Sequence, residues 1–243
     1  MKFFMNFFFV AAHTMLLQKG FSLLLSPKMR LSKHLSMSTL AGSKASPKKL
    51  KIGLFGGGVV GGGVYELITK CQENNRFASI GADMEINKIC VRSLNKKRDF
   101  NVKPSCKVVT NYNDILDDPE INCVVELIGG TTTAKDIVLA SIKAGKHVVT
   151  ANKALIAAYL PEIQVALKAN PSASLSYEAA VCGGIPIIHA LQADFFADTI
   201  KKVMGIMNGT TNFMLCKMED EKANYADALK EAQVDNYLWC LMN

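Results

Sequence analysis

The fold of this chain is decided by one stretch, Lys51-Ile52-Gly53-Leu54-Phe55-Gly56-Gly57-Gly58-Val59-Val60-Gly61. Its apolar beginning, bounded by glycine, is typical of a strand that is buried in a parallel sheet. Apolar residues then recur at helical spacing from Val64 to Lys70. A strand, a glycine turn and a helix in this order form the context that a dinucleotide-binding turn requires.

The glycine pattern Gly56-x-Gly58-x-x-Gly61 has a chemical interpretation. It allows a tight turn, brings backbone N–H groups close to a pyrophosphate, and lets the helix pack closely against the sheet. The positive end of the helix dipole favours the same anion. Six of the eight residues from Gly56 to Gly63 are glycine, so a merely structural turn is the alternative. The flanking strand and helix favour cofactor binding.

Strands continue to alternate with helices along the chain. The pattern predicts strands over 86–91, 122–128, 146–150 and 172–178, and helices over 134–144 and 161–169, with Pro161 at a first helical position. Asn152 is suited to cap a helix that begins at Lys153 or Ala154. The alternation implies an α/β protein with a doubly wound parallel sheet of the Rossmann type.

Arg92 directly follows the second predicted strand, where an NAD-specific site usually has an acidic residue. A guanidinium can pair with the 2′-phosphate of NADP. The basic residues that follow, Lys96, Lys97 and Arg98, either screen that phosphate or form an ordinary solvated loop. The sequence therefore predicts NADP, or the use of both NADP and NAD.

Lys153 stands just beyond the strand that ends at Thr150. In open α/β sheets the carboxyl ends of the strands border the ligand crevice. An ammonium group there can orient a substrate carbonyl, and can exchange a proton with it if its pKa is lowered. A solvated surface lysine is the alternative.

Charge is divided unevenly along the 243 residues. The net charge is +7, but residues 1–50 contain eight Lys or Arg and no acid, which leaves 20 basic and 21 acidic groups in the rest. The basic character belongs to the beginning of the chain, so nucleic-acid binding has little support. The seven cysteines are scattered without a CxxC pair, which favours reduced thiols over a disulfide framework or a zinc site.

Residues 1–48 are typical of a targeting leader or a disordered segment. The apolar run from Phe3 to Leu17 is too short to span a bilayer comfortably, so we do not expect an integral membrane protein. The absence of acids, with many Ser, Lys and Arg, predicts a plastid or mitochondrial transit peptide. The Phe-rich beginning also fits a secretory signal, and translation from Met29 or Met37 would leave a cytoplasmic protein.

Long motifs in the chain resemble homoserine dehydrogenase. They are Val124–Gly130, Gly145–Ala154, Tyr177–Ile188 and Gly205–Phe213. The similarity runs from about Lys51 to about Gln233. It implies NAD(P)-dependent interconversion of L-homoserine and L-aspartate 4-semialdehyde, a step toward threonine and methionine, by a protein that is usually a homodimer.

The resemblance also implies roles for single residues. It assigns Gly56, Gly58, Val59, Val60, Gly61, Arg92, Thr131 and Lys153 to the cofactor, with Arg92 at the ribose or 2′-phosphate and Thr131 near the nicotinamide ribose. Lys153 is the implied catalytic residue and faces the substrate as well. A monovalent cation such as sodium would be held by Glu178, Val181, Gly183 and Ile185, mostly through backbone carbonyls.

The end of the chain departs from the family pattern. The family continues into substrate-binding acids and a second catalytic lysine, whereas residues 234–243 match nothing in that pattern. We therefore expect an NAD(P)-binding Rossmann domain over 49–178 and an incomplete α+β substrate and dimerisation domain over 179–243. Strands over 174–178 and 201–206 would then lack sheet partners, and exposed strand edges invite aggregation or pairing. Because the family is usually dimeric through this domain, we expect the homodimer interface to be compromised. A catalytically impaired NADP-binding fragment is the alternative function.

Overall fold

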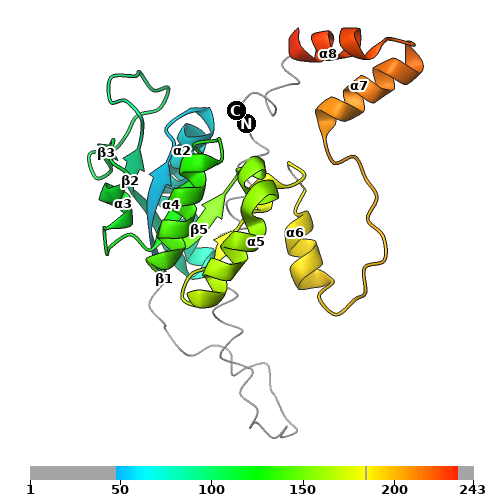
Figure 1. Cartoon of the computed structure of the whole chain (residues 1–243). Helices are drawn as coiled ribbons and strands as arrows, with labels where there is room; N and C mark the ends of the chain where they lie inside the picture. The colour runs from blue at the N-terminus through cyan, green and yellow to red at the C-terminus, as the bar shows by residue number, and fades with distance from the viewer. Residues whose placement is uncertain (1–47, 184, 235–243) are drawn as a thin grey trace, which may run out of the picture. The chain divides into compact units, whose positions relative to one another are not determined.

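A computed structural model describes residues 48–183 and 185–234 of the chain (Figure 1). The described residues divide into two compact units after His189. The leader expected over residues 1–48 lies outside the described part, apart from Lys48 at the beginning of the first strand.

One sheet of six strands forms the centre of the first unit. The strands are β1 (Lys48–Phe55), β2 (Ala82–Cys90), β3 (Lys107–Val109), β4 (Cys123–Glu126), β5 (His147–Thr150) and β6 (Leu175–Ser176). They are all parallel and lie in the order β3-β2-β1-β4-β5-β6. This order reverses its direction between β1 and β4, as in dinucleotide-binding sheets. The predicted doubly wound α/β fold is confirmed.

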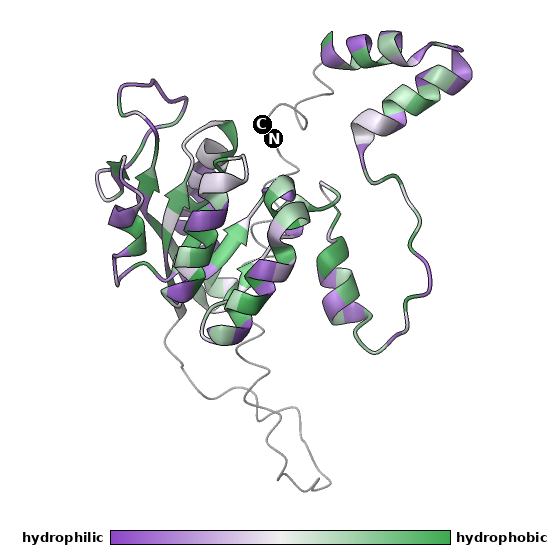
Figure 2. Ribbon diagram, in the orientation of Figure 1, coloured by the Kyte–Doolittle hydropathy of each residue, from purple (hydrophilic) through white to green (hydrophobic). Residues whose placement is uncertain are grey.

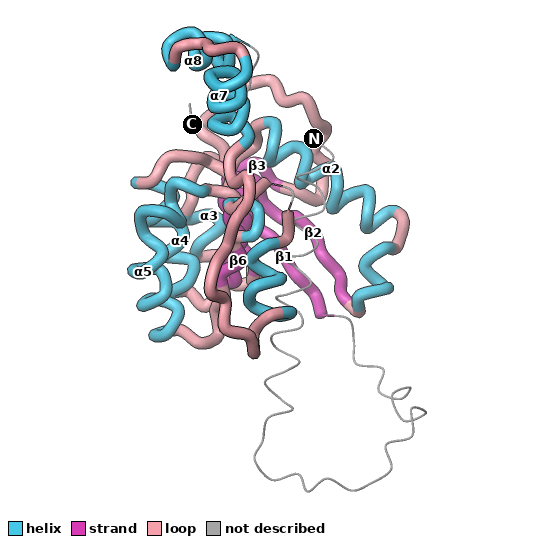
Figure 3. Tube along the Cα trace, turned by 90° about the vertical axis from the view of Figure 1, so that its right-hand side faces the viewer, coloured by secondary structure: helices cyan, strands magenta, loops and turns pink. Residues whose placement is uncertain are grey.

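Helices cover both faces of the sheet. The first unit contains α2 (Val59–Glu73), α3 (Asn113–Leu116), α4 (Thr132–Lys143), α5 (Lys153–Ala169), α6 (Ile187–His189) and the 3-10 turns η2 (Arg76–Ile80) and η3 (Glu178–Ala180). Figure 3 shows α2 on one side of the strands and α4 and α5 on the other. Because both faces are covered, the strands can be apolar throughout.

The core follows the alternation of side chains along the strands. Val125 and Val149 pack in the cluster that includes the α2 residues Leu67 and Ile68. Their neighbours Val124 and Val148 face the opposite side of the sheet, toward α4 and α5. Figure 2 shows these strands in the hydrophobic colours. The continuous apolar runs in the sequence therefore reflect burial on two faces.

The helix predicted to begin at Pro161 begins eight residues earlier, so that boundary is wrong. The Asn152 side chain accepts a hydrogen bond from the N–H of Leu155 at 3.0 Å and caps α5 at Lys153. This confirms the predicted cap. Pro161 lies inside α5, where it cannot donate to the carbonyl of Ala157. Ala157 is exposed, so water can satisfy that carbonyl.

Two strand predictions need correction, and two short elements were not predicted. The strand expected over 172–178 is reduced to β6, and because β6 pairs with β5, it does not lack a partner. Residues 201–206 form no strand in the structure, although a strand was expected there. The short elements β3 and α3 were not predicted, since neither is long enough to show a periodic pattern of apolar residues.

The second unit contains the short π-helical turn η4 (Ala190–Asp194) and two helices, α7 (Gly209–Asp220) and α8 (Tyr225–Val234). Met214 of α7 packs against Ala228 and Ala232 of α8. Lys217 joins the two helices through an ion pair with Glu231 at 2.6 Å. Among the helices described in either unit, none is both long and apolar enough to cross a bilayer.

Gly61→Ala tests the packing of α2 against the turn after β1. An alanine Cβ at position 61 would lie 1.9 Å from the carbonyl oxygen of Gly56, a backbone atom that cannot move aside freely. We expect the free energy of unfolding to fall by about 3 kcal/mol, measured by urea denaturation. Gly63→Ala is the control in the same helix, because its Cβ position has no described atom within 4 Å other than those of its chain neighbours and the backbone of its own helix. It should stabilise the protein by about 0.5–1 kcal/mol. Equal effects of the two changes would contradict this account.

Candidate cofactor and substrate site

The carboxyl ends of the three central strands are aligned. Phe55 of β1 is in register with Glu126 of β4, which is in register with Thr150 of β5. The strand order reverses between β1 and β4, and the crevice at such a point is where ligands bind in open α/β sheets. The turns that follow these three residues therefore border the candidate site.

The turn after β1 is closely packed on one side and open on the other. Gly56 has a φ of +109°, and a Cβ there would lie 2.7 Å from the carbonyl oxygen of Leu127. Gly58 precedes the first residue of α2 and has open space around its Cβ position. Val59 is 55% exposed and Val60 is half-buried. Together with Gly61, these residues leave the N–H groups at the beginning of α2 accessible to a phosphate.

The loop after β2 is organised by Arg98. Its guanidinium donates hydrogen bonds to the carbonyls of Ser93 at 2.8 Å, Lys96 at 3.2 Å and Leu94 at 3.4 Å. Its Nε lies 3.3 Å from the Cβ position of Gly57, so the loop closes against the glycine turn. Arg98 is therefore a half-buried part of the loop structure, and its charge remains on the side of the loop that meets the glycine turn.

Arg92, at the beginning of the same loop, is exposed, as are Lys96 and Lys97. Their charges are accessible to a ligand on this side of the sheet. The structure thus separates two functions within the basic cluster: Arg98 shapes the loop, while the exposed cations provide positive potential.

A buried polar network connects the ends of β4 and β5. The Thr150 hydroxyl donates to Oε2 of Glu126 at 2.6 Å, and the N–H of Ile128 donates to Oε1 at 2.9 Å. Thr150 Oγ1 in turn accepts from the N–H of Asn152 at 3.0 Å. Asn152 Nδ2 reaches the carbonyl of Gly130 at 2.6 Å. Every one of these side chains is buried.

Burial raises the pKa of the Glu126 carboxyl above its ordinary value, and hydrogen bonds from Thr150, Ile128 and Asn152 oppose the rise. A raised pKa means that the folded protein holds this proton more tightly than the unfolded chain does. The contribution of Glu126 to the free energy of unfolding is therefore greatest at low pH and decreases as the pH rises through the raised pKa.

Thr131 and Lys153 stand at the beginnings of the two helices that this network connects. Thr131 is half-buried directly before α4, and Lys153 is exposed as the first residue of α5. Gly129 and Gly130, which precede Thr131, both have positive φ, at +72° and +70°. The Asn152–Gly130 hydrogen bond joins the segments that carry the two predicted site residues.

The predicted cation loop lies after β6. Its Glu178 is buried, and its two carboxylate oxygens accept from the N–H groups of Ile188 at 3.0 Å and His189 at 2.8 Å. The carboxylate is therefore engaged with backbone groups. Cys182 and Gly183 follow with φ of +53° and +57°. Among the residues that the structure describes, no three His, Cys, Asp or Glu side chains cluster as metal ligands.

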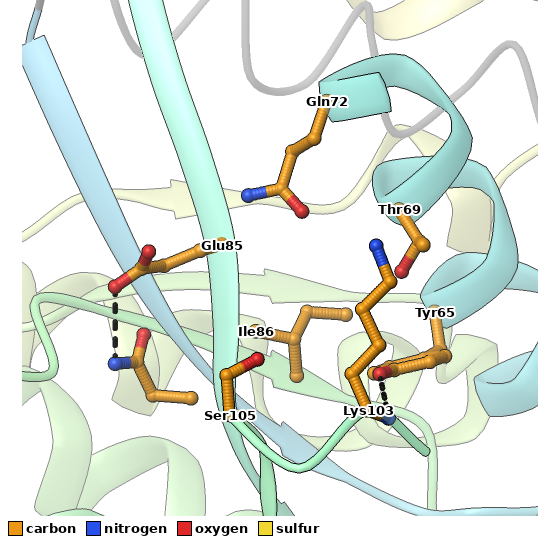
Figure 4. Close-up of a pocket in the computed structure, with 8 residues that line it drawn as sticks. Tyr65, Thr69, Gln72, Glu85, Ile86, Lys103 and Ser105 are labelled. Carbon is orange, nitrogen blue, oxygen red and sulfur yellow. Dashed lines mark hydrogen bonds between the residues drawn. The ribbon is translucent and has the colours of Figure 1, made fainter. Parts of the chain in front are cut away.

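A shallow polar depression between α2 and β2 is a separate feature (Figure 4). It is lined by Tyr65, Thr69, Gln72, Glu85, Ile86, Asn87, Lys103 and Ser105. The N–H of Lys103 donates to the Tyr65 hydroxyl at 2.8 Å. The depression lies beside the middle of β2 and does not include the glycine turn, so we do not assign it to the cofactor.

Comparison with known protein families identifies the chain. Residues 56–175 match the model of the homoserine dehydrogenase NAD-binding domain, and residues 186–238 match the homoserine dehydrogenase model. The expectation that residues 234–243 match nothing in the family pattern is therefore wrong for residues 234–238. The chain belongs to the homoserine dehydrogenase family. Its first unit thus carries the nicotinamide-binding fold of that family, and the family resemblance inferred from the motifs is confirmed.

Individual relatives support the same assignment. Homoserine dehydrogenase of Bacillus subtilis (strain 168) is 41% identical over 186 residues, which are 76% of this chain and 42% of that protein. The crystal structure of a homoserine dehydrogenase from Thiobacillus denitrificans is 42% identical with a TM-score of 0.69, over 79% of this chain and 44% of that one. A hyperthermophilic archaeal homoserine dehydrogenase in complex with NADPH is 25% identical with a TM-score of 0.62, over 79% of this chain and 63% of that one. The chain spans less than half the length of the first two homoserine dehydrogenases.

Sequence reasoning missed the buried network of Glu126 and the hydrogen bonds by which Arg98 organises its loop. The signal for Glu126 was present, because it is a carboxylate within the apolar run Val124–Ile128 of a strand predicted to be buried. A buried carboxylate needs donors, and the nearest register position on β5 holds a hydroxyl. Nothing in the sequence distinguishes Arg98 from its basic neighbours, since its hydrogen bonds depend on how the loop closes.

Arg98→Lys tests the organisation of the loop after β2 in this homoserine dehydrogenase family member. Lysine keeps the charge but lacks the planar guanidinium that donates to three carbonyls in a fixed geometry. We expect trypsin to cleave after Lys96 or Lys97 about tenfold faster, as local opening becomes about 1.4 kcal/mol easier. Arg92→Lys is the control, because it preserves the number of cleavage sites and leaves the Arg98 bonds intact. A cleavage rate unchanged in Arg98→Lys would show that the hydrogen bonds of the Arg98 guanidinium do not hold the loop.

Proposed function

We propose that this chain binds NADP(H) across the glycine turn and interconverts L-homoserine and L-aspartate 4-semialdehyde. The observation that carries the proposal is the alignment of three turns, after β1, β4 and β5, at the point where the strand order reverses. Membership of the homoserine dehydrogenase family supplies the reaction. The NADPH complex of the archaeal relative supports the choice of cofactor.

The side chains have distinct roles in this proposal. The N–H groups beginning α2 bind the pyrophosphate, and Arg92 binds the 2′-phosphate. Thr131 contacts the nicotinamide ribose. Lys153 orients the substrate and stabilises negative charge on its carbonyl oxygen as an aldehyde is reduced. The nicotinamide, when bound, supplies the hydride or takes it up from the alcohol.

A chain that binds the cofactor without turnover is the second candidate. The relatives that are whole homoserine dehydrogenases are more than twice as long as the part of them that this chain spans. We assign residues 49–178 to cofactor binding and 179–243 to part of the substrate domain. The 243-residue protein should be titrated with NADPH and then assayed for NADPH oxidation with aspartate semialdehyde. Binding without oxidation supports the second candidate, and failure to bind NADPH overturns both.

We also propose that the loop over 178–185 binds a monovalent cation such as sodium. The donor set fits, because the carbonyls of Glu178 and Ile185 each accept one backbone N–H and keep a second lone pair for a cation. Val181 and Gly183 provide further backbone carbonyls. Thermal unfolding in sodium chloride and in choline chloride of equal ionic strength tests this part, and equal melting temperatures would contradict it.

Assembly, location and pathway are part of the same proposal. Exposed apolar side chains in the second unit, including Phe196 at 80% and Met204 at 77%, support self-association of the chain, and sedimentation velocity can distinguish a homodimer from a monomer and from larger aggregates. The composition of residues 1–48 supports a plastid or mitochondrial location over the cytoplasm, to be tested with a fluorescent fusion. The reaction would serve threonine and methionine biosynthesis.

Arg92→Ala tests the preference for NADP. Loss of a charge-assisted contact to the 2′-phosphate, about 1.5–3 kcal/mol, should raise the dissociation constant of NADPH about 10- to 100-fold. The dissociation constant of NADH, which lacks that phosphate, should change by less than about threefold. Lys97→Ala is the matched control from the same exposed cluster. An equal rise in the dissociation constants of NADPH and NADH in Arg92→Ala would show that this residue does not recognise the 2′-phosphate.

Lys153→Ala tests the catalytic assignment. We expect the turnover number to fall at least about 100-fold, because the ammonium stabilises charge that develops on the substrate oxygen. The dissociation constant of NADPH should rise by less than about tenfold. Lys168→Ala, at the opposite end of α5, is the control for removing a lysine from this helix. Steady-state kinetics that are the same in the wild type and in Lys153→Ala would exclude a role in the chemistry.

A further inference from the structure

Glu126 is an unusual residue for its position. Its side chain has no exposed surface, and it occupies the last position of a strand whose other three residues, Cys123, Val124 and Val125, are apolar and buried. A carboxylate that is removed from water costs free energy unless donors surround it. Burial raises its pKa even so, which means that hydrogen bonding does not fully offset the cost. A leucine or isoleucine would fill a strand end between apolar neighbours without that cost.

The donors of this network form a chain that begins at Asn152 and ends at the carboxylate of Glu126. The N–H of Asn152 donates to Thr150 Oγ1, and the Thr150 hydroxyl donates its single hydrogen to Glu126. The N–H of Ile128 donates to the other carboxylate oxygen. Glu126 is therefore an acceptor for donors from the end of β5 and from the turn after β4. An ionised carboxylate suits this position because it has only acceptors, whereas glutamine would direct an amide N–H₂ toward one of these donors.

The network extends to the two helices at the crevice. Asn152 also donates from Nδ2 to the carbonyl of Gly130 at 2.6 Å and accepts from the N–H of Leu155 at 3.0 Å. Gly130 directly precedes Thr131, and Asn152 directly precedes Lys153. A displacement of Thr150 would therefore reach both residues, because their segments are joined by Asn152.

We propose that Glu126 is a positioning residue that, through Thr150 and Asn152, fixes Thr131 and Lys153 relative to each other at the nicotinamide end of the crevice. The inference rests on the proposed function for the identity of the ligand. It separates the crevice into two parts. The adenosine part, formed by the glycine turn and Arg92, has none of the hydrogen bonds of this network. The nicotinamide part depends on them.

Two ligands can distinguish these parts. NADPH occupies both, whereas adenosine 2′,5′-bisphosphate reports the adenosine part alone. In Thr150→Val, which keeps the shape of the side chain and removes the hydroxyl, we expect the dissociation constant of NADPH to rise about tenfold. The dissociation constant of adenosine 2′,5′-bisphosphate should stay within about twofold of the wild-type value. Thr150→Ser retains the hydroxyl and should restore NADPH binding to within about threefold.

Lys146→Met is the matched control for loss of buried polar contacts. Lys146 immediately precedes β5, and its ammonium donates to the carbonyls of Asp118 at 2.6 Å and Ile121 at 2.7 Å. It is buried like Thr150 but lies at the opposite end of β5. We expect Lys146→Met to lower the melting temperature without changing the ratio of the two dissociation constants.

Hydrogen exchange tests the network without any ligand. The amides of Ile128, Asn152 and Leu155 donate within it, so peptides covering 127–131 and 151–156 should exchange about tenfold faster in Thr150→Val and in Glu126→Gln. Faster exchange in only one of the two segments would overturn the inference. So would an equal rise in the dissociation constants of NADPH and adenosine 2′,5′-bisphosphate in Thr150→Val that Thr150→Ser does not reverse. If the wild type binds neither ligand, the proposed function fails, while coupled exchange in both segments would still support the positioning network.

Discussion

The carbonyl oxygens of Leu127 and Gly56 occupy the space that side chains at positions 56 and 61 would need, at 2.7 Å and 1.9 Å from the corresponding Cβ positions. This steric constraint brings three backbone segments together: the turn after β1, the first turn of α2 and the beginning of the loop after β4. A side chain at either position would separate α2 from the sheet and turn its N–H groups away from the crevice. The anion-binding geometry therefore follows from the absence of two Cβ atoms.

The ends of the strands carry the polar groups that the strand interiors exclude. Immediately before β5, the Lys146 ammonium donates to two loop carbonyls, and burial lowers the pKa of this amine. At the carboxyl ends, Glu126 accepts from the end of β5 and from the turn after β4. The amino ends of the strands thus fix a loop through a cation, and the carboxyl ends fix a turn through a carboxyl group. The second arrangement borders the crevice, which is why its geometry bears on binding and not only on stability.

Sequence reasoning succeeded where a local pattern determines the structure. The glycine spacing, the apolar strands and the Asn152 cap are local, and each predicted its element. It failed where two local signals compete or where the folded context decides. Pro161 resembles a first helical residue, but the cap at Asn152 had already begun the helix. Residues 201–206 have a strand composition, yet a strand requires a pairing partner, and no described segment pairs with them. Arg98 differs from Lys97 only through the loop that encloses it.

The contacts that shape the crevice all lie within the first unit. The close approach at Gly56, the fork of Arg98 and the network from Glu126 to Gly130 involve residues 56–155 only. The second unit has its own small core between α7 and α8. The geometry of the proposed cofactor crevice is consequently fixed by contacts within one unit, and none of these contacts requires a residue of the second unit.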